Sequence, residues 1–528
     1  MKKMIVAFAA IVSLAVSAAT WERAGSLQLA DTTGLTTAVA KLGEISGNQM
    51  LGAMAAAYLS QLPTSEFFGP MRQGGSVAFA LYLDMDAFAK AGTGDEEALD
   101  DLDDDAVKYA VIYPMALPKD EFMKLHEGAV ETNGLVRVKG LPVGDADEDD
   151  FTSVAFVEDG KWAVASENPE MVALAVRDIA EFVKPMDGDV VRYAATPKGF
   201  EALRMVIDVA AKKCDDDDDD KIDIATAVDL LKGLNSVRFA LRVGDAGVDF
   251  LGGYSAIEGT TLSRMGASTF SAESLSEAGD DALSFSKTSL AKMDIEPQWK
   301  IVSGVLAKHK IDTSSFIKWQ FAPATRLTVD LPALVGWAKA AETNGLDEVD
   351  FDEISDDLAS ALAGKCKCEP ATAPESCAIA FAGFKPQFSA AGRFNATIPE
   401  AAGKQLVSAS VLSLGGIVQA VLPSVLASLD AETRAMVAPM AALLPKEAKC
   451  GLASALWRES DGSFAGIMRI SADEIKGIGS SVGAIMAASM MNGGLTPSFD
   501  DDDDDDDDGD DDADDAAADD DADTSDED

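Results

Sequence analysis

Runs of aspartate set the strongest limit on how this 528-residue chain can fold. The stretch from Asp500 to Asp528 holds 21 acidic residues and no basic one, and dense acidic runs also occur at 95–105, 145–150 and 215–220. Adjacent aspartates repel one another and have poor helix and strand propensity. We therefore expect the internal runs to be solvated loops and residues 500–528 to be a disordered acidic tail.

Composition excludes several classes of protein. A net charge of -48 leaves no basic stripe to displace counterions from phosphates, so we expect no nucleic-acid partner. The hydrophobic content of 47% is too high for a wholly disordered chain. The length favours more than one domain.

The N-terminus has the pattern of a secretory signal. Met1-Lys2-Lys3 is positively charged, residues 4–16 are apolar, and small side chains suited to cleavage follow. We expect residues 1–18 to be a signal peptide. The protein is then exported to the periplasm or the outside of a cell, and the short Lys-Lys start is typical of a bacterium.

Four short patterns recur in the same order in the two halves of the chain, which indicates a tandem duplication. The first is a Leu-Pro pair that begins a helical pattern after an apolar run, and the second is the Glu-Thr-Asn-Gly-Leu sequence that ends the same helical pattern. The third is an Arg-aromatic pair before a proline, and the fourth is a hairpin that reaches an aromatic residue. The paired positions are Leu117 with Leu331, Glu131 with Glu342, Arg192 with Arg393, and Phe250 with Phe464.

Strand-like and helix-like segments alternate within each half. Asp159-Gly160 separates two strand-like runs as a hairpin turn would, and adjacent hairpins imply antiparallel pairing. The sequence therefore predicts an α+β fold of two related lobes, with antiparallel sheets and packed helices. We expect an N-terminal helical segment at 19–69, lobe A at 70–260, and lobe B with extra helices at 261–499.

The stretch between Lys404 and Asp430 has no charged residue and is long enough to cross a membrane. Five serines and Pro423 dilute it, so we interpret it as a buried amphipathic helix pair broken near Pro423. A second uncharged stretch, between Lys476 and Asp500, is interpreted as core in the same way. We expect no integral membrane span, and a groove for a hydrophobic ligand between such helices stays open as an alternative.

Five cysteines are disulfide candidates in an exported protein. A zinc site is the alternative for the cluster of three, but it needs a fourth ligand and no histidine lies nearby. The candidates are Cys214, Cys366, Cys368, Cys377 and Cys450.

Catalytic motifs are present only in fragments. The G-x-S-x-G pattern around Ser481 lacks a histidine after it, because both histidines precede it. The S-x-x-K patterns at Ser289 and Ser315 lack the downstream elements of penicillin-binding enzymes. We assign no catalytic residue and no cofactor, and we favour a protein that is not an enzyme.

The acidic tail offers carboxylates to cations without a fixed cage. Weak calcium association is expected there, because the loop-like start lacks the closing glutamate of an EF-hand. The carboxylates concerned belong to Asp500, Asp501, Asp502, Asp504, Asp506 and Asp508.

Together these patterns favour an exported binding or scaffold protein whose acidic loops and tail meet cations or cationic partners. The alternative is a carrier that holds a hydrophobic ligand between the two lobes. An unrecognised hydrolase is the third hypothesis.

Overall fold

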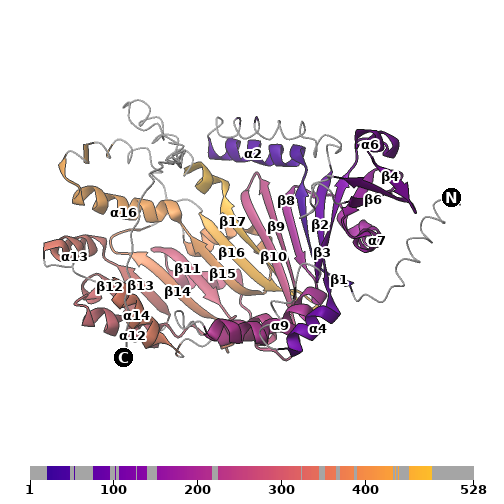
Figure 1. The fold of residues 1–528 in the computed structure, drawn as a ribbon. Helices are drawn as coiled ribbons and strands as arrows, with labels where there is room; N and C mark the ends of the chain where they lie inside the picture. Colours follow the sequence, from indigo (N-terminus) through magenta and orange to yellow (C-terminus); the bar gives the residue numbers. More distant parts are fainter. Residues whose placement is uncertain are drawn as a thin grey trace, which may run out of the picture. The chain divides into compact units, whose positions relative to one another are not determined.

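The computed structural model describes most of the chain between residues 21 and 477. The described ranges are 21–47, 75–94, 106–126, 128–139, 151–216, 224–322, 324–343, 351–363, 369–385, 389–431 and 451–477, with a few isolated positions besides. Within them, helices and strands are built around one large, mostly antiparallel sheet (Figure 1). The mixed α+β class predicted from the sequence is confirmed.

The sheet has 17 strands in the described part of the chain. Ten come from the first half of the sequence: β1 (Trp21–Ala30), β2 (Ser76–Asp84), β3 (Val107–Pro114), β4 (Val130–Thr132), β5 (Leu135–Lys139), β6 (Phe151–Val157), β7 (Trp162–Ser166), β8 (Asp189–Ala195), β9 (Leu234–Gly244) and β10 (Gly247–Ala256). Seven come from the second half: β11 (Ala282–Thr288), β12 (Ile317–Gln320), β13 (Thr325–Val329), β14 (Glu375–Phe381), β15 (Leu406–Leu412), β16 (Leu452–Arg458) and β17 (Phe464–Ser471).

Side by side, the strands run in the order β4-β5-β6-β7-β3-β2-β1-β8-β9-β10-β17-β16-β15-β11-β14-β13-β12. Among these described pairings, β13 with β14 is parallel and the others are antiparallel. The two halves of the chain therefore share one sheet and meet where β10 pairs with β17.

Helices connect the strands. In the first half they are α2 (Thr32–Ser46), α4 (Met85–Thr93), α6 (Lys119–Leu125), α7 (Pro169–Arg177), α8 (Ile179–Phe182), α9 (Pro197–Asp216), α10 (Ile224–Gly233) and α11 (Thr261–Arg264). In the second half they are α12 (Ile295–Lys308), α13 (Leu331–Thr343), α14 (Phe351–Leu362), α15 (Ala390–Thr397) and α16 (Leu414–Ser428). Short 3-10 turns are η2 (Ala272–Ala278), η3 (Thr313–Ser315) and η5 (Pro399–Ala401).

Strand β1 corrects the expected N-terminal helical segment. Residues Trp21–Ala30 form a central strand between β2 and β8, and only the following Thr32–Ser46 is helical, with Asp31 accepting a hydrogen bond from the Gly34 amide at 2.8 Å. Partners on both sides, distant in sequence, decide the conformation of β1, and local patterning does not reveal them.

One face of the sheet, here called the covered face, carries the main core. In the first half, α7 and α8 pack on Ala80, Ala110 and Val164; in the second half, α15 and η2 pack on Phe285 and other side chains of β11, β15 and β16. Each buried Phe or Val side chain contributes about 1.5–3 kcal/mol through removal of apolar area from water. These two helical layers fix the halves of the sheet separately.

The expected duplication has a mixed outcome at the level of single positions. Phe250 and Phe464 both lie on the second strand of a hairpin, and Leu117 and Leu331 both stand where a strand gives way to a helix. Arg192, in contrast, lies in strand β8, whereas its expected counterpart Arg393 lies in helix α15.

The match between Glu131 and Glu342 also joins unlike elements. Glu131 is in strand β4, whereas Glu342 is near the end of helix α13. Both of these correspondences are wrong. Short matches in a chain rich in alanine and leucine do not carry enough information to fix an element.

The uncharged stretch after Lys404 differs from its prediction. Leu406–Leu412 is strand β15, and Leu414–Ser428 is one helix, α16, that continues through Pro423. The valines at 407 and 411 are four residues apart, which also suits the buried face of a strand. No helix in the described residues is long and apolar enough to cross a membrane.

A buried ion pair joins the two halves at their shared strands. The Arg469 guanidinium on β17 donates to both carboxylate oxygens of Asp249 on β10, at 2.5 and 2.8 Å, and to the carbonyl oxygen of Thr397 at 3.0 Å. Glu400 accepts two further bonds, at 2.8 and 3.2 Å. The hydrogen bonds to Asp249 hold the pKa of Arg469 above its usual range.

Candidate binding surface

The second face of the sheet, here called the open face, carries a continuous row of apolar side chains. Directly opposed residues in neighbouring strands point to the same face. The register places Phe79, Leu27, Tyr193 and Phe239 in one row across β2, β1, β8 and β9. Tyr193 is 44% exposed and Phe239 is 37% exposed, so this row stays in contact with solvent.

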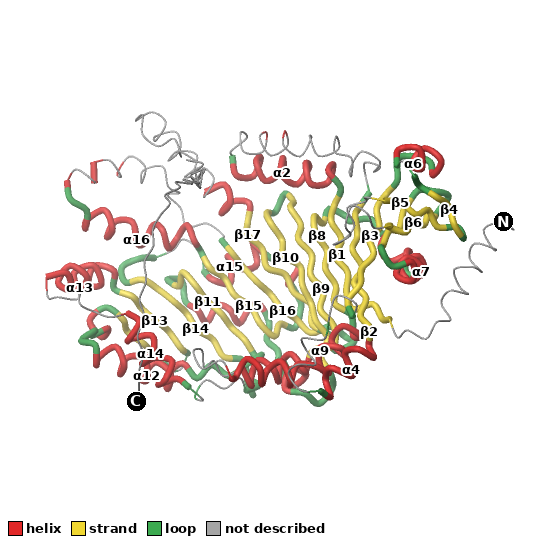
Figure 2. Tube along the Cα trace, viewed as in Figure 1, coloured by secondary structure: helices red, strands yellow, loops and turns green. Residues whose placement is uncertain are grey.

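Helices reach the open face mainly at the ends of its strands. Figure 2 shows β8, β9, β10, β17 and β16 running unobstructed between α2 above and α9 below, with α15 behind the sheet. The described core on this side lies over β2, β3, β5, β6 and β7, where Phe122 of α6 packs on Val136 and Ala163, and a smaller cluster joins Leu83 of β2 to Ala202 of α9. Large aromatic residues on a sheet surface that no described helix covers are a typical mark of a binding site.

An apolar pocket of about 690 Å³ lies at the first-half end of the open face. Its floor is formed by Leu27, Leu81 and Tyr193 from three strands, and its wall by Phe200 and Leu203 of α9. No charged side chain lines this pocket, although the chain carries a net charge of -48. The pocket is therefore suited to an uncharged, apolar occupant.

Helix α9 is placed against the pocket by a close approach of backbone. Pro197 begins the helix, and the Thr196 hydroxyl donates to the Arg23 carbonyl oxygen of β1 at 2.5 Å. A Cβ on Gly199 would lie 2.5 Å from the Ala24 carbonyl oxygen, so only glycine permits this contact. Gly199 therefore determines how closely α9, which forms the wall of the pocket, packs on β1.

The open face becomes more polar in the second half. Phe250 on β10 is opposite Met468 on β17, and the same row continues through Ser454, Ser410 and Ser286. The hydroxyls of Ser410 and Ser454 are 2.7 Å apart and hydrogen-bonded. Along this row the surface therefore passes from aromatic and aliphatic groups to neutral hydroxyls.

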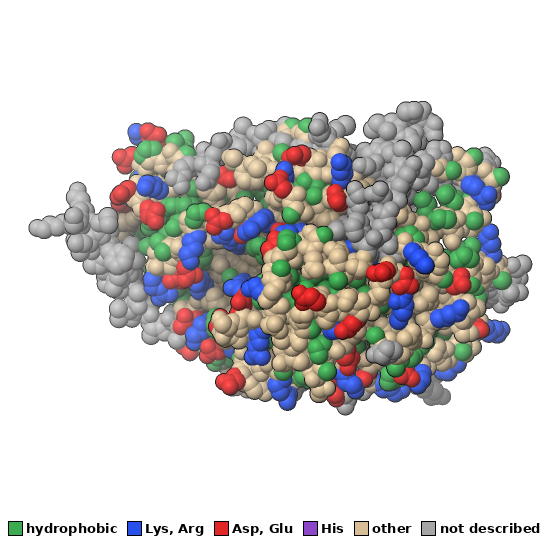
Figure 3. All heavy atoms as spheres, turned by 180° about the vertical axis from the view of Figure 1, so that it is seen from behind, with side chains coloured by type: hydrophobic (Ala, Val, Ile, Leu, Met, Phe, Trp, Pro, Cys, Tyr) green, Lys and Arg blue, Asp and Glu red, His purple; other side chains and the backbone are tan. Residues whose placement is uncertain are grey.

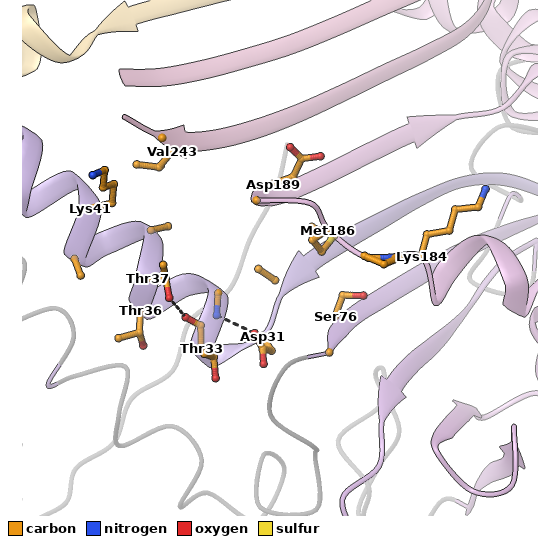
Figure 4. A pocket seen from close by; sticks show the side chains of 18 of the residues that line it. Asp31, Thr33, Thr36, Thr37, Lys41, Ser76, Lys184, Met186, Asp189 and Val243 are labelled. Carbon is orange, nitrogen blue, oxygen red and sulfur yellow. Dashed lines mark hydrogen bonds between the residues drawn. The ribbon is translucent and has the colours of Figure 1, made fainter. Parts of the chain in front are cut away.

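A larger polar cleft of about 990 Å³ lies between α2 and the strand ends (Figure 4). Its charges are largely neutralised within the protein: Lys41 is paired with Asp245 and with Glu44. Its hydroxyls are also engaged, because Thr37 donates to the Thr33 carbonyl oxygen at 2.7 Å. Apart from Lys184 at its edge, the cleft thus presents few charged or hydroxyl groups with unmet bonding capacity.

Buried Asp189 closes the inner side of this cleft. Its carboxylate accepts from Arg192 at 2.6 Å and from Arg242 at 2.7 and 2.8 Å. Arg192 also donates to the carbonyl oxygens of Pro185 and Met186. This network fixes the loop before β8 and makes Asp189 a structural group.

Of the predicted cysteine sites, the structure describes one side chain. Cys377 lies half-buried in β14 as a free thiol, and burial raises its pKa. Cys214 is within helix α9, but its side chain is outside the description. Cys366, Cys368 and Cys450 are outside the described residues, so the disulfide and zinc hypotheses stay predictions.

The serine motifs within the described residues do not form nucleophile–base pairs. The Ser289 hydroxyl donates to the carbonyl oxygens of Ser268 and Val407, while Lys292 is paired with Asp294. Ser315 donates to a backbone carbonyl at 3.4 Å. Ser481 lies outside the described residues.

The proposed calcium positions in the tail also lie outside the described residues: Asp500, Asp501, Asp502, Asp504, Asp506 and Asp508. Within the described ranges, no three metal-ligating side chains come together.

Sequence reasoning missed the open face. Strand β9 alternates apolar residues on the open face (Val237, Phe239, Leu241) with polar or small residues on the other face (Arg238, Ala240, Arg242), and such an apolar face is normally the buried one. Only the structure reveals that no described helix covers the apolar face of this strand.

Searches of family models, curated proteins and solved structures found no match for this chain.

Proposed function

We propose that this protein is a non-enzymatic binding protein that holds an uncharged apolar ligand on the open face of its sheet. The observation that carries this proposal is the pocket of about 690 Å³ with no charged lining residue. Pockets of about 300–1,000 Å³ are typical for small-molecule ligands, and most are lined by apolar side chains.

The surface beside the pocket favours an elongated ligand with a neutral polar end. Four strand spacings separate Tyr193 on β8 from the Ser454 row on β16, a span of roughly 19 Å. An apolar chain lying across β9, β10 and β17 brings its end to the hydroxyls of Ser454 and Ser410. Those hydroxyls both donate and accept, so they suit an alcohol, ester or amide.

The acidic segments have a physical role in the same proposal. An exposed apolar sheet face promotes association between copies, whereas a large net charge of one sign opposes it. We propose that the acidic loops and tail keep the open face from self-association, and that they also attract cations weakly. The signal-like N-terminus favours a site of action outside the cytoplasm, in the periplasm or beyond.

We also propose that the two halves arose by duplication, restricted to four strands. The strands β1, β8, β9 and β10 follow one another across the sheet in the same order as β11, β15, β16 and β17. Gly252 and Gly466, which correspond under the expected repeat, stand directly opposite each other where the halves meet. This arrangement supports a two-fold relation between the halves.

A neutral fluorescent probe tests the binding function. Nile red should bind the full-length protein saturably, and Leu81→Asp should weaken its affinity at least tenfold. Full contact with a leucine contributes about 1.5–3 kcal/mol, and a nearby carboxylate is costly to desolvate. Leu125→Asp is the matched control, because Leu125 is 61% exposed at the end of α6 and does not line the pocket. Equal affinity in the three proteins would refute the proposal.

A further inference from the structure

A groove of about 490 Å³ lies on the covered face, where the helical layers of the two halves leave the sheet exposed between them. Lys and Arg side chains gather around a hollow on this face in Figure 3. The groove crosses β1, β8, β9, β10 and β17, and thus spans the junction of the two halves. We call it the basic groove.

Small side chains form the floor of the basic groove. Ala194, Ala240 and Ala465 lie on β8, β9 and β17, where larger residues would fill the gap. Phe182 of α8 and Trp457 of β16 stand on opposite sides. The indole N–H of Trp457 donates to Glu459 at 2.6 Å, which fixes the ring as a rigid apolar wall.

Part of the charge around the groove is neutralised by ion pairs. Glu181 is paired with Arg23 at 2.6 Å, and Arg192 with Asp189 at 2.6 Å. Beside the indole ring, the ammonium group of Lys404 lies 3.8 Å from Glu459. These groups contribute little net charge to the groove.

Two cations remain. In the described part of the chain, neither Lys184 nor Arg238 has a hydrogen bond or ion pair, and both are exposed at the groove. Arg238 does exert an electrostatic influence on Asp461, but that carboxylate accepts its hydrogen bonds from Ser463 at 2.6 and 2.9 Å. Two unpaired cations beside an apolar floor are unusual in so acidic a protein.

We propose that the basic groove binds an amphipathic organic anion. The anionic head accepts hydrogen bonds from Arg238 and Lys184, and the apolar body lies on the alanine floor against Trp457. Arginine suits this role because its planar guanidinium offers two parallel donors to a carboxylate or sulfonate. The site is separate from the open face, because the two surfaces lie on opposite sides of one sheet.

An anionic probe tests this site in the full-length protein. We would titrate 8-anilinonaphthalene-1-sulfonate into the wild type, the double variant Lys184→Gln/Arg238→Gln, and the control Arg264→Gln. Arg264 is also exposed but lies on α11 and does not line the groove. The double variant should bind about tenfold more weakly, since it loses two charge-assisted bonds. The control should match the wild type, and decanoate should displace the probe better than decanol does.

A second variant separates charge from shape. Ala240→Leu keeps both cations but fills the floor, so it should also weaken probe binding, with far-ultraviolet circular dichroism confirming that the fold is retained. Two results would overturn the proposal: a double variant within twofold of the wild type, or equal losses in the double variant and Arg264→Gln. If only Leu81→Asp abolished binding of the sulfonate probe, the probe would bind on the open face, and the proposal of a separate site in the basic groove would be contradicted. Nile red binding that survives in the double variant keeps the two proposals distinguishable.

Discussion

The ion pair between Asp249 and Arg469 is a sensitive point in the junction of the two halves. Asp249→Asn keeps the size of the side chain but removes its charge. It also replaces one of the two oxygens that accept hydrogen bonds from Arg469, at 2.5 and 2.8 Å. Arg469 is 5% exposed, so water does not replace what is lost. Removing one partner of a buried pair costs about 3–5 kcal/mol when the remaining charge is left alone.

Arg469 is not left entirely alone in this variant. Glu400 and the Thr397 carbonyl oxygen still accept from it. We therefore expect Asp249→Asn to lower the free energy of unfolding by about 2–4 kcal/mol, which is less than the cost of leaving a buried charge with no partner. Glu400→Gln should cost less, because the Glu400 side chain is half exposed and water can solvate the change.

Urea unfolding followed by tryptophan fluorescence measures this loss. Asp245→Asn is the control: Asp245 also forms a short ion pair, with Lys41, but its side chain is 91% exposed. The control should leave the unfolding midpoint unchanged. If Asp249→Asn were as stable as the control, the buried pair would not hold the halves together and the reasoning from burial would fail.

Three further predictions concern single buried or half-buried groups. Tyr82→Phe should stabilise the protein by about 1 kcal/mol, because the Tyr82 hydroxyl is buried and has no hydrogen-bond partner among the described residues; a lower urea midpoint would contradict this. Burial raises the pKa of Glu474, so the folded protein holds the proton on this carboxyl more tightly than the unfolded chain does. The free energy of unfolding therefore falls as the pH rises from the usual glutamate range through the raised pKa. The stability of Glu474→Gln relative to the wild type should thus increase with pH over that window, and a flat difference between the two unfolding curves would refute it. Burial also raises the pKa of the Cys377 thiol, so iodoacetamide should label Cys377 more slowly at pH 7.5 than it labels a free cysteine peptide, as peptide mass spectrometry can measure; labelling at the peptide's rate would contradict its burial.

Local patterns predicted the mixed α+β class and the hairpin at Asp159-Gly160. The Asp159-Gly160 turn adopts the positive φ angles that its residues favour, and it joins two paired strands, β6 and β7, as predicted. Such signals depend on neighbours in the sequence, so one chain is enough to recognise them.

Tertiary contacts decided what the patterns could not predict. β1 is a strand because β2 and β8 flank it, and β15 is a strand because β11 and β16 do. Pro423 does not break α16, although its ring removes one backbone donor from the helix. These outcomes depend on partners that are distant in the sequence.

The candidate sites also combine features that are evident from the sequence with features that only the structure reveals. The apolar character of Tyr193 and Phe239 is evident from the sequence, but the fact that no described helix covers them is not. The basic groove depends on Lys184 and Arg238, which are 54 positions apart and meet only through the sheet. The sequence offered, as an alternative, a carrier with a hydrophobic ligand between the two lobes, whereas the open-face pocket that we propose instead is lined by first-half residues and could be recognised only in the structure.

Mass spectrometry of an organic-solvent extract tests the binding function most directly. The protein would be purified from its native compartment without detergent, and extracted in parallel with a Leu81→Asp variant prepared in the same way. We expect one uncharged apolar compound in near-stoichiometric amount from the wild type, and much less of it from the variant. An extract of folded wild-type protein that contains no such compound, together with no saturable binding of Nile red, would contradict the account.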